Sequence, residues 1–187
     1  HKIKLKEIIF VGDSHVEFYS RLYRINSQNS KINVKSLWLG PTTMAGFSTS
    51  QLAQKWLLAT LKELKTKNLS CKNTAIIFSL GHIDIRTSLG FLITTKVVKN
   101  SEEAIEKLSS IFQNLLQSNL MRSLRLNYSS VSWMAIPPPS PDDGININNC
   151  SKKQAIKFIK NDNVTIFGNS IERANWTSSL NQKLNEL

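Results

Sequence analysis

The stretch Ile8-Ile9-Phe10-Val11-Gly12-Asp13-Ser14-His15 contains the strongest fold signal in the chain. Glu7–Val11 is rich in β-forming residues, and Gly12 follows it at once. From His15 to Arg24, apolar residues recur at helical spacing. The sequence therefore predicts a strand, a tight turn and a helix, with Ser14 in the turn.

The rest of the chain repeats this alternation of strands and helices. Three further apolar runs predict strands, at 32–39, 74–80 and 130–136. Helices are expected at 51–65, from Ser101 to about Leu115, at 152–159 and at 170–187, and residues 163–167 are expected to be extended. This order predicts an α/β fold: a three-layer α/β/α sandwich whose mainly parallel sheet has Glu7–Val11 at its centre.

The composition fits one domain spanning residues 1–187. Of these residues 41% are hydrophobic, enough for a core, and no run is long enough for a membrane span. The net charge is +11, but the basic residues are spread along the chain, so we expect no nucleic-acid partner. Cys71 and Cys150 lack the spacing of a metal site or a disulfide scaffold.

Three unusual segments each follow a predicted strand. They are Gly12–His15, Gly40–Met44 and Gly81–Arg86, and Pro137–Pro139 ends the fourth strand. The carboxyl ends of parallel strands share one edge of a sheet, and ligands bind beyond that edge in open α/β folds. We therefore expect these segments to converge on one site.

Ser14 is the candidate nucleophile of this site. At a helix N-terminus the backbone N–H groups are unpaired, so a serine there has oxyanion donors beside it. Serine is also a good helix cap, and the sequence leaves both roles open. We expect Asp13 to bind turn amides and His15 to point away from Ser14 along the helix.

The three segments resemble conserved blocks of the SGNH hydrolases, also called GDSL-type esterases. Residues 8–15 resemble the first block, Trp38–Met44 the second, and Phe78–Arg86 the third, in the Gly-Glu-Ile-Asp-x-Arg form of one subgroup. The pairs Glu172-Arg173 and Leu180-Asn181 also suit that subgroup.

The resemblance implies a flavodoxin-like fold and a serine-dependent ester hydrolase. It makes Ser14 the nucleophile, with the Ser14 and Gly40 amides in the oxyanion hole. The remaining residues assigned to the site shape it: Asp13, His82, Asp84 and Arg86. The expected substrates are small acyl esters or acyl groups on carbohydrates, and neither a metal nor another cofactor is needed.

The chain departs from the family pattern in two ways. Ile83 stands where the common third block has an oxyanion-donating Asn. The family's general base is the His of a late Asp-x-x-His, whereas this chain has only His1, His15 and His82. We expect a C-terminal strand and that His to lie beyond Leu187, and hydrolysis of activated esters to be weak or absent without them. His82 is an alternative base.

Two other functions fit the same residues. A binding module could keep the SGNH fold without turnover. A metallophosphoesterase is the second alternative, because Asp13-x-His15 and Gly81-x-x-Asp84 resemble parts of its metal-binding blocks. The chain starts at His1, so we expect a processed or excised N-terminus, and a cytoplasmic location is slightly favoured.

Overall fold

The computed structural model describes residues 5–26, 32–66, 71–161 and 165–187. These residues form two compact units. Of the described residues, unit 1 includes 5–26, 32–42, 46–66, 71–80 and 114–135, and unit 2 includes 43–45, 81–113, 136–161 and 165–187. Each unit is described by itself below, and the expectation of a single domain stays a prediction.

A four-stranded parallel sheet organises unit 1. Its strands are β1 (Glu7–Gly12), β2 (Asn33–Trp38), β3 (Thr74–Ser79) and β4 (Ser130–Trp133), in the order β2-β1-β3-β4. This order is that of flavodoxin-like sheets, in which the chain switches direction between β1 and β3. The predicted α/β class and the central position of β1 are confirmed.

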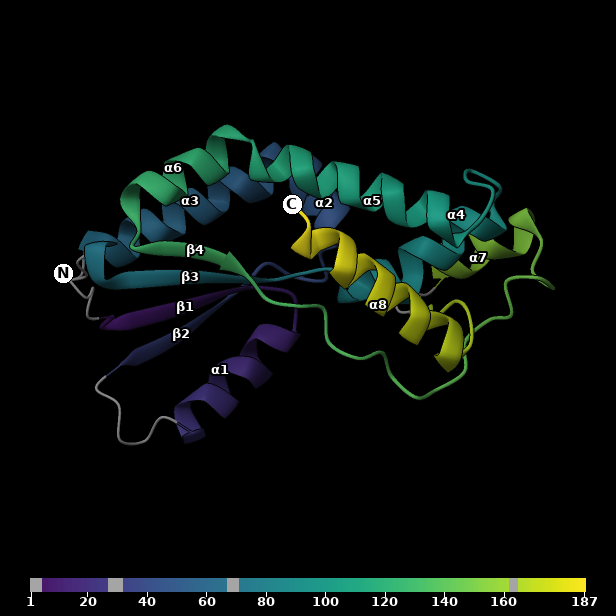
Figure 1. Ribbon diagram of the computed structural model, residues 1–187, viewed down its shortest axis with the longest axis horizontal. Helices are drawn as coiled ribbons and strands as arrows, with labels where there is room; N and C mark the ends of the chain where they lie inside the picture. Colours follow the sequence, from purple (N-terminus) through teal and green to yellow (C-terminus); the bar gives the residue numbers. More distant parts are fainter. Residues whose placement is uncertain (1–4, 27–31, 67–70, 162–164) are drawn as a thin grey trace. The chain divides into compact units, whose positions relative to one another are not determined.

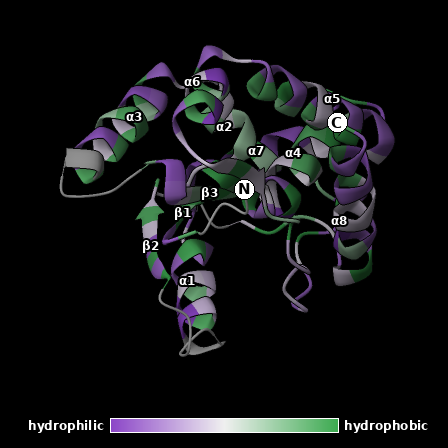
Figure 2. Cartoon of the chain, turned by 60° about the vertical axis from the view of Figure 1, so that its left-hand side comes forward, coloured by the Kyte–Doolittle hydropathy of each residue, from purple (hydrophilic) through white to green (hydrophobic). Residues whose placement is uncertain are grey.

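Helices cover both faces of this sheet, so that the unit has three layers. Helix α1 (His15–Asn26) lies on one face, and α3 (Gln51–Thr66) and α6 (Asn119–Asn127) lie on the other (Figure 1). The colours of Figure 2 alternate between hydrophilic and hydrophobic along α1 and α3, as expected for helices with one buried side.

The alternation of side chains along β1 separates two parts of the core. Ile8 and Phe10 cluster on the α1 face, together with Val16 of the helix itself. Ile9 and Val11 belong to the opposite side of the strand and are fully buried. On β3, Phe78 stacks on Trp133 of β4 with ring centroids 4.7 Å apart.

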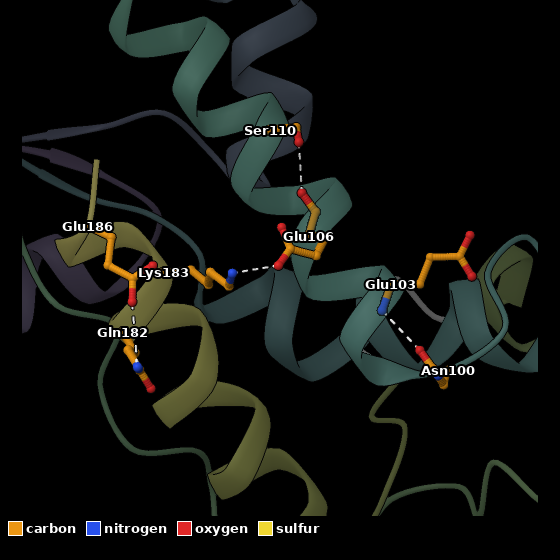
Figure 3. Close-up of polar contacts among 7 residues, drawn as sticks. All are labelled: Asn100, Glu103, Glu106, Ser110, Gln182, Lys183 and Glu186. Atoms are coloured by element: carbon orange, nitrogen blue, oxygen red, sulfur yellow. Dashed lines mark hydrogen bonds and ion pairs between the residues drawn. The ribbon is translucent and has the colours of Figure 1, made fainter.

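Unit 2 is built of helices and connecting loops. Its main elements are a π-helical turn (Asp84–Ser88), α4 (Leu89–Thr94), most of α5 (Ser101–Leu116), α7 (Lys152–Asn161) and α8 (Ser170–Asn185). Elsewhere in the described residues, α2 (Met44–Thr49) begins in unit 2, and a 3₁₀ turn (Cys71–Asn73) belongs to unit 1. Lys183 of α8 forms an ion pair with Glu106 of α5 at 2.6 Å (Figure 3), and the hydrogen bond in this pair raises the pKa of Lys183.

Arg173 is the most deeply buried cation of unit 2. Its guanidinium donates hydrogen bonds to the carbonyl oxygens of Gly168, Ser140 and Asp142. Burial lowers the pKa of Arg173, and neighbouring acidic side chains oppose that shift. Asn181 of the same helix exchanges two hydrogen bonds with the backbone of Ile136, at 2.8 and 3.0 Å. Arg173 and Asn181, one from each of the two late residue pairs in the sequence, thus hold loops of unit 2 in place.

Several sequence predictions were wrong in detail. The fourth strand ends at Trp133 rather than at residue 136. Helices α2, α4 and α6 were not predicted, and neither was the helical turn that contains His82. The expected extended piece at 163–167 overlaps residues 162–164, which lie outside the described residues, and Phe167 makes an isolated parallel bridge to Ile145.

Gly12 is the residue of β1 that we expect to tolerate least change. A Cβ atom there would lie 1.9 Å from the carbonyl oxygen of Ser79, so β1 and β3 could not keep their spacing. We expect Gly12→Ala to lower the free energy of unfolding by about 3 kcal/mol or more, as severe overpacking does. Urea denaturation followed by circular dichroism measures this loss.

Gly40→Ala is the matched control. Its backbone has a φ of +82°, but a Cβ there would meet no described atom within 4 Å. Only the left-handed backbone opposes this change, so we expect a loss of about 1 kcal/mol. Equal losses for the two variants would contradict the steric explanation for Gly12.

Candidate functional site

The carboxyl-terminal edge of the sheet in unit 1 holds the first two sequence blocks. In the parallel register, Gly12 of β1 lies opposite Trp38 of β2 and Ser79 of β3. Beyond the last pair, the Leu39 N–H donates to the Gly12 carbonyl at 2.7 Å. Ser14 and Gly40 therefore both leave the same edge of the sheet, as the sequence indicates.

Asp13 caps helix α1 in place of Ser14. Asp13 is 1% exposed, and its Oδ1 accepts a hydrogen bond from the His15 backbone N–H at 3.0 Å. The Asp13 carbonyl also accepts from the Val16 N–H at 3.2 Å. The expectation that Asp13 binds turn amides agrees with this geometry.

Ser14 is left exposed by this arrangement. Its hydroxyl makes no hydrogen bond to any residue that the structure describes, so it does not act as the helix cap. Its backbone N–H also donates to none of these residues. A hydroxyl and an unpaired N–H thus lie together at the positive end of the α1 dipole.

Gly40 presents a second unpaired backbone donor on this edge. Its N–H makes no hydrogen bond within the described part of the chain, although its carbonyl accepts from Thr42 N–H at 2.8 Å. The left-handed backbone at Gly40 turns the chain directly after β2. An acyl oxygen bound here would find N–H donors, which is the chemistry of an oxyanion hole.

The His15 ring lies against the Asp13 carboxylate. Its ring Nδ1 lies 2.9 Å from Asp13 Oδ1. The buried carboxylate two positions earlier holds the ring there, and the expectation that His15 points away from Ser14 stays a prediction. No motif in the sequence indicated this contact beyond the Asp13-x-His15 spacing itself.

The third block begins on β3 in unit 1, and its residues from Gly81 to Arg86 lie in unit 2, where they are described on their own. Asp84 is fully buried, and its Oδ2 accepts a hydrogen bond from the Met44 N–H at 2.6 Å. His82 is half-buried, and the Arg86 carbonyl accepts from Phe167 N–H at 2.9 Å. Asp84 therefore anchors Met44, the last residue of the second block. The site-shaping roles of His82 and Arg86 stay predictions.

No metal-binding cluster is found in the described residues. Within 5–26, 32–66, 71–161 and 165–187, no group of three or more His, Cys, Asp or Glu side chains is arranged to hold an ion. The metallophosphoesterase alternative requires such a cluster. Within the same residues, no helix is both long and apolar enough to cross a bilayer.

Comparison with known proteins identifies no family for this chain. No family model matches it, and no curated protein matches it. A solved structure of an acetyl xylan esterase is similar at a TM-score of 0.38 and 12% identity, over 93% of this chain and 97% of the other. Similarity at this level does not identify a family or a site.

We expect Mn²⁺ and Zn²⁺ to leave the thermal stability of the protein unchanged. An ion held only by the native state must raise its stability, and the described residues offer no ligand cluster. Differential scanning fluorimetry with and without each ion measures this. A rise in Tm with Mn²⁺ that is lost in Asp13→Ala would favour the metal-dependent alternative.

We expect Asp84→Ala to destabilise the protein by about 2–3 kcal/mol. Removing the carboxylate leaves the buried Met44 N–H without its acceptor, and an unsatisfied buried donor costs free energy. Asp142→Ala is the control, because it removes an exposed carboxylate of the same unit. Urea denaturation compares the two variants, and equal losses would contradict an anchoring role for Asp84.

Proposed function

We propose that this protein is a serine-dependent ester hydrolase of the SGNH type, acting on small acyl esters or on acylated carbohydrates. The observation that supports it is the exposed Ser14 hydroxyl at the N-terminus of α1, with unpaired N–H groups at Ser14 and Gly40 on the same sheet edge. The resemblance of the sequence blocks to those of SGNH hydrolases supports the same assignment.

In this mechanism the Ser14 Oγ attacks the acyl carbon of the ester. The Oγ–H bond breaks, the Oγ–C bond forms, and a base accepts the proton. The carbonyl oxygen becomes an oxyanion, which the Ser14 and Gly40 N–H groups stabilise together with the positive end of α1. Loss of the alcohol leaves an acyl-enzyme, which water hydrolyses in a second step of the same kind.

The capping role of Asp13 explains why Ser14 is available for this chemistry. A helix N-terminus needs an acceptor for its first N–H groups, and the serine hydroxyl would ordinarily supply it. Asp13 Oδ1 fills that need at His15 N–H, so capping does not occupy the Ser14 hydroxyl. The space where a Cβ of residue 40 would lie is also open, with no described atom beyond the chain neighbours within 4 Å.

Ile83 limits the rate that we expect. It occupies the position of a family oxyanion donor and has no side-chain N–H to give. Absence of one such donor lowers the rate by about 10²–10³-fold. We therefore propose a slow hydrolase, for which an activated ester is the appropriate test substrate.

We expect wild-type protein to release p-nitrophenol slowly from p-nitrophenyl acetate, and Ser14→Ala to abolish this release. The variant lacks the attacking oxygen but keeps the backbone donors. Ser132→Ala is the matched control, since Ser132 is an exposed serine of the same unit outside the site. Release at the same rate in wild type and Ser14→Ala, or none in wild type, would exclude the proposed function and favour a binding module.

A further inference from the structure

A cavity of about 570 Å³ lies within unit 1, between helices α3 and α6. Its apolar walls are Leu58 and Leu61 of α3 and Leu124 of α6. The other lining residues are polar: Lys62, Cys71, Ser123, Asn127 and Tyr128. A mainly apolar cavity of roughly 300–1,000 Å³ with a few polar groups is the usual form of a small-molecule site.

The cavity lies toward the amino-terminal edge of the sheet, away from Ser14. Cys71 begins the 3₁₀ turn that leads into β3, and Tyr128 lies between α6 and β4. The Ser129 N–H donates to the Cys71 carbonyl at 3.1 Å, which holds these two segments together. Ser14 follows β1 at the opposite, carboxyl-terminal edge of the same parallel sheet. The cavity is therefore separate from the site of the proposed function.

Two of the polar groups in the cavity satisfy each other. Burial first, and then the charge and the hydrogen bond at Cys71, raises the pKa of Tyr128 to about 12, so the protonated phenol donates to the Cys71 sulfur. Cys71 itself is buried, and a buried thiol packs much as a small apolar group does. The inner part of the cavity, where Leu61 and Leu124 are also buried, therefore suits an apolar chain.

The charges around the cavity favour an anionic group at its outer part. Lys62 is exposed, is the one charged side chain among the described residues that line the cavity, and forms no ion pair with them or with the rest of the described chain. Glu7 is buried and does not line the cavity, but its negative charge adds to the rise in the pKa of Tyr128. An anion is therefore repelled from the inner end and attracted to Lys62.

We propose that this cavity binds a medium-chain aliphatic carboxylate, with its chain along the buried leucines and its carboxylate at Lys62. Bound in this direction, the chain also covers Leu58, which is 37% exposed at the outer part of the cavity, and removes this apolar surface from water. A cavity of this volume takes a single small molecule rather than a complete phospholipid. The ligand chemistry thus follows from an apolar interior and one unpaired cation at its rim.

The first test is isothermal titration calorimetry with decanoate, kept below the concentration at which it forms micelles. We expect saturable binding of one decanoate per chain. Decyltrimethylammonium is the matched probe, because it has the same chain with a cationic head, and we expect it not to bind. No saturable binding of decanoate, or equal binding of the two probes, would overturn the proposal.

Paired variants of α3 test the position of the ligand. We expect Leu58→Trp to weaken decanoate binding by at least about tenfold, because the larger side chain occupies the outer part of the cavity. Leu52→Trp makes the same change on the same helix at a residue outside the cavity. Lys62→Met should weaken binding by about 2–5-fold, the worth of an exposed ion pair, and Lys55→Met is its control. Equal affinities within either pair would contradict the assigned position, and thermal melts establish that each variant is folded.

The two cysteines of the chain provide a second readout. Cys71 lines the cavity, whereas Cys150 lies in unit 2 and outside it. We expect decanoate to slow the alkylation of Cys71 by N-ethylmaleimide and to leave Cys150 unaffected, as measured by peptide mass spectrometry. Slowing at both cysteines, or at neither, would overturn the proposal. Ser14→Ala should bind decanoate as the wild type does, so failure of the proposed function leaves this inference standing.

Discussion

The close approach of β1 and β3 at Gly12 is the constraint on which the rest of unit 1 depends. With no side chain at Gly12, the Ser79 carbonyl can lie where a Cβ would otherwise be, and the Asp13 N–H reaches that same carbonyl at 3.4 Å. The central strand can therefore pair fully with β3 on one side and with β2 on the other. Because β1 ends at this point, the next three residues form the turn at the edge of the sheet.

The burial of Asp13 is the next consequence. A carboxylate that is 1% exposed must be matched by donors, because an unpaired buried charge is costly. The N-terminus of α1 supplies an N–H and a favourable dipole, and the His15 ring supplies the second contact. The capping of the helix by Asp13, the exposure of Ser14 and the orientation of His15 thus have one physical origin.

Periodicity made most of unit 1 predictable from the sequence. The alternation in Glu7–Val11 and the nearly continuous apolar run at 74–80 indicate buried parallel strands, and both form. The helices that were missed are short or lack a clear stripe: α2 has six residues, and the segment after Gly81 passes through a π-helical turn. Local sequence carries little signal for such elements, since tertiary packing determines them. The fourth strand is shorter than its apolar run because β4 pairs with β3 only as far as Trp133.

The candidate site was predictable as a location but not as an arrangement. Chain order and strand ends are enough to bring Ser14 and Gly40 to one edge, since both depend only on parallel pairing. The direction of the His15 ring could not be predicted in this way. In an ordinary helix that side chain would point away from the turn. Here the contact with Asp13 holds the ring against the turn instead, and the strength of this contact depends on how deeply Asp13 is buried.

The short distance along the chain between Asp13, Ser14 and His15 has a consequence for how the candidate site assembles. A group on a distant loop must be positioned by the packing of that loop, and small displacements then cost reactivity. Here Asp13, Ser14 and His15 are consecutive, so the end of β1 and the start of α1 orient them together. The only further element that the proposed chemistry requires in unit 1 is the Gly40 N–H, which the neighbouring strand β2 brings to the same edge. The proposed reaction therefore depends on the pairing of two adjacent strands and on the depth at which one carboxylate is buried.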